Sequence, residues 1–174
     1  MLAFLWIIEI LNLITGHSLN YLGIRPLEID GIKGILFAPF LHGSVSHLMS
    51  NSLPFLILMW IVLTFYDDIW IRVSVFSIIL GGIGVWLLGG QGTVHVGASG
   101  LIFSFIGFLL ASGVFRRNIK SFIISLAVFL LYGGTLIFGV LPGQPGISWQ
   151  GHLFGALAGV VLAWVYRKKQ AQEQ

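Results

Sequence analysis

The chain has 174 residues, of which 57% are hydrophobic and only 9% are charged. Soluble domains usually carry about 25% charged residues, so this composition excludes an ordinary soluble domain and indicates that lipid surrounds most of the chain. The formal net charge of +3 rests on nine basic groups, and this does not indicate nucleic-acid binding. The absence of cysteine excludes disulfides, thiolate metal sites and cysteine nucleophiles together.

Six segments are apolar and long enough, or nearly so, to span a membrane, which takes roughly 20 mostly apolar residues. They cover 2–16, 48–66, 69–89, 99–115, 119–141 and 151–166. The first segment lacks the basic start and the cleavage site of a secretory signal, so we expect a retained membrane helix. We therefore expect one all-α membrane domain over 1–174, with six transmembrane helices and a long, partly membrane-embedded first loop over 17–47.

The basic residues predict which end of this bundle faces the cytoplasm. Most of them fall at the turn between the second and third helices, at the turn between the fourth and fifth, or at the C-terminus: Arg72, Arg116, Arg117, Lys120, Arg167, Lys168 and Lys169. With six spans these positions share one side, and only Arg25 and Lys33 fall on the other. The positive-inside rule then places both termini in the cytoplasm. The second, fourth and sixth helices therefore begin at the extracytoplasmic face.

Three polar residues from distant parts of the sequence are predicted to lie at one depth. Counting about 1.5 Å per helical residue from the cytoplasmic ends puts Ser99 at roughly 25 Å, His152 at roughly 22 Å and Asn51 at roughly 24 Å. In a hydrocarbon core of about 30 Å, all three lie several ångströms below the outer surface. Because polar groups are costly to expose to lipid, we expect them to face the bundle interior or a water-filled cavity.

A serine and a histidine at one depth on neighbouring helices indicate a nucleophile and a general base. His152 is suited to take the proton of the Ser99 hydroxyl and to pass it to a leaving amine. His47, Asn51 and the backbone N–H of Ser99 could donate hydrogen bonds to a tetrahedral oxyanion. No carboxylate lies near this depth on the same helices, so we expect a Ser–His dyad.

Small residues recur at intervals that favour close contact between two of the helices. Gly151, Gly155, Gly159 and Ala163 are spaced every four residues in the sixth segment, and Gly100 with Ser104 has the same spacing in the fourth. Such stripes let two helix backbones approach closely. If these faces pack together, they bring the serine and the histidine within reach of each other.

The motifs resemble those of the rhomboid intramembrane serine proteases. The match rests on His42-x4-His47-x3-Asn51, on GASG around Ser99 and on GHLFGALAG around His152. The three motifs stand in the family's order, each at the same end of alternate helices, and the resemblance covers nearly the whole chain. A lone Gly-x-Ser-Gly is common, whereas the three together are specific.

The resemblance implies a bacterial-type, multi-pass protease of the plasma membrane. Such an enzyme cleaves transmembrane segments of other, single-span proteins near the extracytoplasmic face and uses no metal or cofactor. Ser99 would be its nucleophile, His152 its general base, and His47, Asn51 and the Ser99 N–H its oxyanion donors. The supporting residues would be His42, Gly97, Gly100 and Phe103, and the stretch 142–150 would form a flexible cap over the site.

Several residues admit a structural interpretation beside the functional one. Phe103 stands where some family members have a tyrosine that stacks on the catalytic histidine, so it could stack but not hydrogen-bond. His42 suits a structural hydrogen bond within the first loop at least as well as a direct catalytic role. We expect His95 to be structural, and Glu9 in the first helix to form a hydrogen bond to an adjacent helix.

Other functions fit the sequence less well. A metalloprotease would need His-Glu-x-x-His on one helix face, which HGSVSH does not supply. A rhomboid-like protein that binds membrane clients without cleaving them typically lacks the serine or the histidine, and this chain keeps both. A small transporter or proton channel would show paired intramembrane charges or broken helices related by a repeat. Client binding without proteolysis is the main alternative.

Overall fold

The computed structural model describes residues 1–167, and over that range the fold is all-α, as predicted. One isolated bridge joins Ile24 to His95. The first connection also contains three short 3₁₀ helices, η1 (Ser18–Leu22), η2 (Ile29–Gly31) and η3 (Ala38–Phe40). The α-helices are α1 (Leu2–Ile14), α2 (Gly34–Phe37), α3 (Val45–Phe65), α4 (Trp70–Leu88), α5 (Ser99–Phe115), α6 (Ile119–Gly139) and α7 (Trp149–Val165).

Two helices begin earlier than predicted because a serine caps each of them. α3 begins at residue 45 rather than 48, since the Ser44 hydroxyl accepts a hydrogen bond from the His47 N–H at 3.1 Å. α7 begins at 149 rather than 151, since Ser148 accepts from the Gly151 N–H at 3.1 Å. α1 and α6 each end two residues early, at 14 and 139. The first loop therefore covers 15–44 instead of 17–47, and the expected cap covers 140–148 instead of 142–150.

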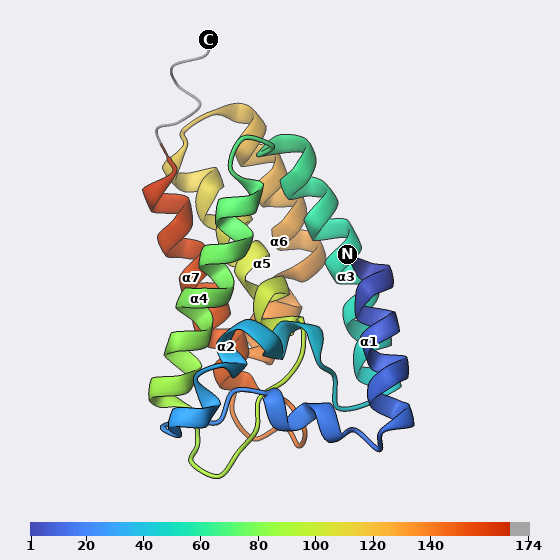
Figure 1. The fold of residues 1–174 in the computed structure, drawn as a ribbon. Helices are drawn as coiled ribbons and strands as arrows, with labels where there is room; N and C mark the ends of the chain where they lie inside the picture. Colours follow the sequence, from blue (N-terminus) through green and yellow to red (C-terminus); the bar gives the residue numbers. More distant parts are fainter. Residues whose placement is uncertain (168–174) are drawn as a thin grey trace.

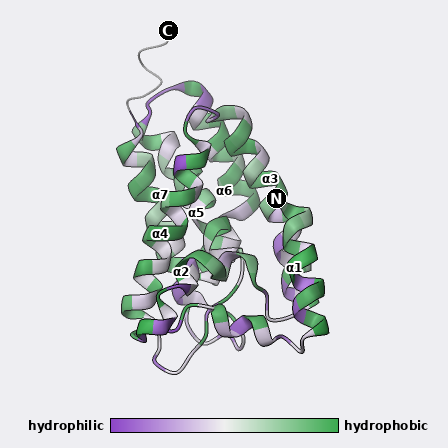
Figure 2. Ribbon diagram, viewed as in Figure 1, coloured by the Kyte–Doolittle hydropathy of each residue, from purple (hydrophilic) through white to green (hydrophobic). Residues whose placement is uncertain are grey.

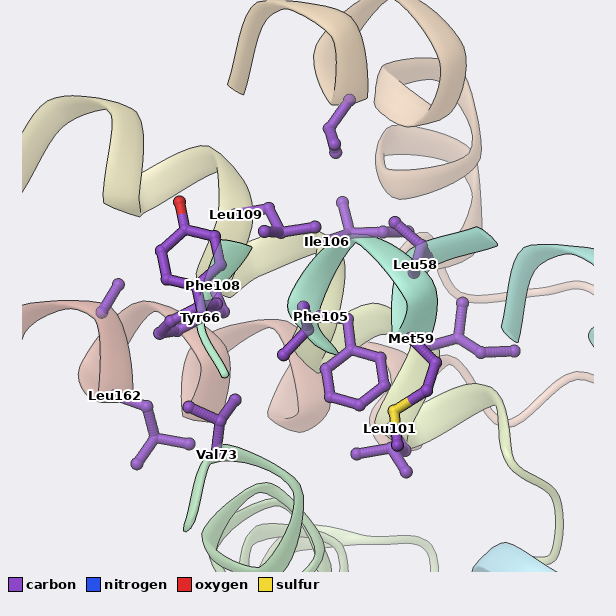
Figure 3. Packing of buried hydrophobic residues seen from close by; sticks show 14 of the residues in the cluster. Leu58, Met59, Tyr66, Val73, Leu101, Phe105, Ile106, Phe108, Leu109 and Leu162 are labelled. Carbon is purple, nitrogen blue, oxygen red and sulfur yellow. The ribbon is translucent and has the colours of Figure 1, made fainter. Parts of the chain in front are cut away.

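α5 is the central helix of the bundle (Figure 1). It packs most extensively against α7 and α6 and also contacts α3 and α4. Eleven of its 17 residues are buried, against four of the 21 in α6. In the main core, Phe105 and Ile106 of α5 pack with Leu58 of α3, Val73 of α4 and Leu162 of α7 (Figure 3).

α3, α5 and α7 all begin at the same end of the bundle (Figure 1). The connections 15–44, 89–98 and 140–148 lie at that end. The opposite end holds the short turns 66–69 and 116–118 and the end of α7. Arg116, Arg117 and Arg167 lie at this second end, whereas Lys168 and Lys169 are outside the described residues.

The helices are mostly apolar along their length, with many polar residues toward the two ends of the bundle (Figure 2), and many large apolar side chains are exposed. On α6, Leu130 and Leu131 are 74% and 69% exposed. Large exposed apolar surfaces of this kind mark contact with a membrane or another protein. α3, α4 and α6 are long and apolar enough to cross a membrane, while α1, α5 and α7 are apolar but shorter.

Candidate active site

Ser99 is the first residue of α5 and follows a sharp turn at Gly97. The φ angle of Gly97 is 122°, a conformation that residues with a side chain rarely adopt. A Cβ atom at Gly97 would lie 2.8 Å from the His47 ring and 3.6 Å from the Ser99 hydroxyl oxygen. Both the backbone angle and the space therefore require glycine, and the turn brings Ser99 and His47 close to the same point.

His152 lies in the first turn of α7, and two contacts fix its ring. Nδ1 is 2.9 Å from the carbonyl oxygen of Gly139, at the end of α6. Because a carbonyl can only accept, Nδ1 carries the proton and Nε2 keeps its lone pair. Phe103, one turn after Ser99, stacks on the ring with a centroid distance of 3.9 Å and an interplanar angle of 6°. His152 is therefore held as the tautomer whose free basic nitrogen is Nε2.

α5 and α7 pack backbone against backbone below these two residues. A Cβ atom at Gly155 would meet the carbonyl group of Gly100, well inside contact distance. A Cβ atom at Gly159 would likewise meet the carbonyl group of Ser104. The small-residue faces predicted from the sequence do pack together, and this contact holds the first turns of α5 and α7 side by side.

A cavity of about 940 Å³ lies at the end of the bundle where α3, α5 and α7 begin, and residues of the connections 89–98 and 140–148 complete its walls. Within residues 1–167, the Ser99 hydroxyl and the His152 ring are not hydrogen-bonded to each other; such contacts are often long without substrate and tighten when it binds. Gly97 and Gly100 border a second cavity of about 60 Å³, which Ser99 also lines. Five of the predicted site residues line the larger cavity: His47, Asn51, Ser99, Phe103 and His152.

His47 and Asn51 lie one turn apart on α3 and both face the larger cavity. Asn51 is 7% exposed, and its Nδ2 atom finds no hydrogen-bond partner within residues 1–167. Leaving a buried donor unpaired costs about 1–3 kcal/mol. An unpaired amide in a cavity wall therefore suits a site where a ligand supplies the acceptor.

His42, the outer histidine of the same motif, does not line the cavity. It is fully buried, and its Nε2 accepts a hydrogen bond at 3.3 Å from the N–H of Ala98, the residue before Ser99. Burial, with a smaller contribution from nearby His47, lowers the pKa of His42 to about 4, so the ring is neutral, as an accepting nitrogen requires. The hydrogen bond is not within the first loop, as the structural interpretation had it, but joins that loop to the turn before Ser99.

Ser148 belongs to the site, although no motif singled it out. Its side chain caps α7 and is 2.6 Å from Nδ1 of His95, and both residues line the larger cavity. The pattern of a serine followed three residues later by the Gly151-His152 pair, at the start of an apolar run, is an N-cap signal that could have found it.

Glu9 does not form the hydrogen bond predicted for it. It is 1% exposed, and within residues 1–167 its carboxyl oxygens make no hydrogen bond. The His17 ring lies nearby, with its Nδ1 4.0 Å from Glu9 Oε1. The prediction of a hydrogen bond to an adjacent helix is therefore wrong. Asn12 makes the polar contacts from α1 instead, since its Nδ2 donates to the His42 carbonyl at 3.3 Å and to Asn20 Oδ1 at 3.0 Å.

Comparison with known proteins identifies the family. The sequence-family model described as the Rhomboid domain matches residues 31–169. The chain belongs to the rhomboid family. This family consists generally of intramembrane serine proteases and also has inactive members. Membership, together with the apolar helices, makes the chain an integral membrane protein.

Mycobacterial relatives match nearly the whole rhomboid chain. An uncharacterized protein of Mycobacterium tuberculosis is 43% identical over 171 residues, which cover 94% of this chain and 71% of that protein. An uncharacterized protein of Mycobacterium bovis matches to the same extent. One from Mycobacterium leprae is 42% identical over 172 residues, covering 94% of this chain and 68% of the relative. These relatives support the family and carry no assigned activity.

Proposed function

We propose that this rhomboid-family protein is an intramembrane serine endopeptidase that cleaves transmembrane segments of single-span membrane proteins. One observation carries the proposal: Ser99 and His152 line one cavity at the first turns of two helices in backbone contact. The Nδ1 bond to Gly139 leaves Nε2 of His152 as the nitrogen that can take a proton. A nucleophile beside an oriented base is the arrangement that acyl transfer requires.

In the proposed reaction the Ser99 hydroxyl attacks the scissile carbonyl carbon while His152 Nε2 accepts the hydroxyl proton. The carbonyl oxygen becomes an oxyanion, which the amide of Asn51, the ring of His47 and the N–H of Ser99 stabilise. His152 then gives its proton to the leaving amine, and an acyl-enzyme remains. A water molecule, deprotonated by the same nitrogen, hydrolyses the ester and restores the serine.

The histidine acts without a carboxylate in this proposal. The Gly139 carbonyl accepts from Nδ1 and fixes the tautomer, which is the orienting role that an aspartate has in a triad. The stacked Phe103 ring fixes the tilt of the imidazole. The reaction thus needs a Ser–His dyad held by a backbone carbonyl and an aromatic ring.

The membrane arrangement that goes with this function has six spans, with the cavity end at the extracytoplasmic face. The basic residues of the opposite end support that orientation, which places both termini in the cytoplasm. The first connection, 15–44, then lies partly in the outer leaflet, and the connection 140–148 covers the site. A substrate helix presents its scissile bond to the cavity from the membrane.

The test is cleavage of single-span substrates by the purified protein in liposomes, with labelling by a serine-directed fluorophosphonate. Wild type is expected to cleave and to be labelled, and both Ser99→Ala and His152→Ala are expected to lose cleavage. The matched control is Ser74→Ala, because the Ser74 hydroxyl donates within its own helix to the Trp70 carbonyl. Full cleavage by Ser99→Ala would refute the nucleophile. Client binding without proteolysis predicts no Ser99-dependent labelling of wild type.

A further inference from the structure

His95 joins three separate parts of the fold at the edge of the site. It lies in the connection that leads from α4 to Ser99, four residues before the serine. Its backbone pairs with Ile24 of the first connection, through N–H···O bonds of 2.9 and 3.0 Å. Its side chain lies between Thr93 and Ser148, so it links the approach to the nucleophile with the cap of α7.

The direction of each hydrogen bond around His95 follows from its partners. The Thr93 hydroxyl donates to the Gly90 carbonyl at 2.5 Å, so toward His95 its oxygen can only accept. His95 Nε2, at 2.8 Å from that oxygen, therefore carries the ring proton. Nδ1 is then an acceptor, and the Ser148 hydroxyl donates to it at 2.6 Å. Burial lowers the pKa of His95, which keeps the ring in this neutral state.

Ser148 links His95 to the first turn of α7. Its hydroxyl oxygen accepts from the Gly151 N–H at 3.1 Å, and its carbonyl accepts from the His152 N–H, also at 3.1 Å. The Gly151 N–H is one of the first N–H groups of the helix, which have no partner in the helix itself, so the cap bond from Ser148 helps to decide where the first turn lies. The residue that carries the base thus has its backbone fixed by a serine whose hydroxyl is itself fixed by His95.

We propose that His95 is a positioning residue for the general base His152 and acts through Ser148. It ties the first turn of α7 to the connection that leads into Ser99, and so sets the placement of base relative to nucleophile. This inference rests on the proposed function. Small displacements between reacting groups are costly, and about 1 Å can lower a rate on the order of 100-fold.

Two isomeric substitutions separate positioning from general packing. In His95→Asn the side-chain oxygen lies near the position of Nδ1 and can still accept a hydrogen bond from Ser148. In His95→Gln the longer side chain places its amide near the position of Nε2, and the acceptor for Ser148 is lost. The measured quantities are kcat on a single-span substrate and the rate constant of fluorophosphonate labelling at Ser99. Each is divided by the amount of folded protein, which thermal unfolding determines. We expect His95→Asn within about threefold of wild type and His95→Gln lower by roughly tenfold or more, with KM little changed.

The outcomes distinguish this inference from the proposed function. If wild type neither cleaves nor labels, the proposed function fails. If wild type is active and His95→Gln is as fast as His95→Asn, the protease stands and the positioning role is overturned. If neither variant folds, Ser148→Thr and Ser148→Ala replace them, because threonine keeps the hydroxyl and alanine removes it. Equal rates for that second pair would also overturn the inference.

Discussion

The substitution Gly155→Ala tests whether backbone contact between α5 and α7 places His152, the proposed general base. The new methyl group would meet the carbonyl and Cα of Gly100. These are main-chain atoms that cannot rotate away, so the helices must separate by about 1 Å to restore an ordinary contact. Overpacking of this kind costs about 1–3 kcal/mol. Alanine recovers about 1 kcal/mol over glycine in a helix, so the expected net loss of stability is about 0–2 kcal/mol.

Activity should fall by more than the fraction of unfolded protein can explain. A separation of about 1 Å moves the first turn of α7 away from Ser99, and misplacement by that amount can cost on the order of 100-fold in rate. We expect kcat to fall between about tenfold and 100-fold in a liposome cleavage assay. Over the same samples, thermal unfolding should show that most of the protein stays folded.

A neighbouring glycine gives the matched control. Gly81 of α4 faces the same stretch of α7, but a Cβ atom there would lie 3.5 Å from the Gly155 Cα, which is ordinary contact. Gly81→Ala should therefore keep wild-type activity and unfold at the same or a slightly higher temperature. If Gly155→Ala cleaves as fast as Gly81→Ala, close packing of α5 and α7 does not set the catalytic geometry.

Three further predictions follow from single contacts in the site. Asn51→Ala should lower kcat by at most about 10²–10³-fold, and less than Ser99→Ala does, because other donors share the oxyanion; equal losses would contradict this sharing. Phe103→Leu removes the ring stacked on His152 and should lower kcat between about twofold and tenfold with KM retained, which steady-state kinetics can check. His42→Gln should remove a pH dependence of stability. Burial lowers the pKa of His42 from 6.5 to about 4. Between these two pH values the unfolded chain therefore binds a proton on this residue that the folded chain does not. This stability is complete above pH 6.5 and is lost as the pH falls to 4, up to about 3 kcal/mol. Thermal unfolding at pH 7.5 and 4.5 should therefore show a larger drop for wild type than for His42→Gln, and equal drops would refute the assignment.

Much of the site could be predicted because the depth of a residue in a membrane helix can be counted from the sequence. The rise per residue is constant in a helix, so the distances of Ser99, His152 and Asn51 from their charged ends place them at one level. The structure brings all three to one cavity. The four-residue spacing of Gly155 and Gly159 indicates their packing face for the same reason, since a helix repeats its faces at that interval.

The hydrogen bonds at helix ends and in the connections could not be predicted by counting residues in this way. α7 begins at 149 because a hydroxyl accepts from Gly151, and that hydroxyl is placed by His95, 53 residues earlier in the chain. The first connection has short helices without a periodic pattern, so its contacts with Asn12 and with the turn before Ser99 were not visible in the sequence. Glu9 shows the same limit, because its surroundings depend on where that connection folds back.

The partner of His152 explains why so many contacts converge on this one residue. A carboxylate beside Nδ1 would stabilise the imidazolium by its charge, whereas the Gly139 carbonyl offers only a dipole. If the proposed protease function holds, the site must obtain more of its rate from placement than from charge, and placement requires constraint on the ring and on the backbone that carries it. Phe103 and Gly139 constrain the ring, Ser148 fixes the N–H of the residue, and the contact at Gly155 fixes its helix. A dyad of this kind should therefore lose activity through many distant substitutions that leave its serine and histidine untouched.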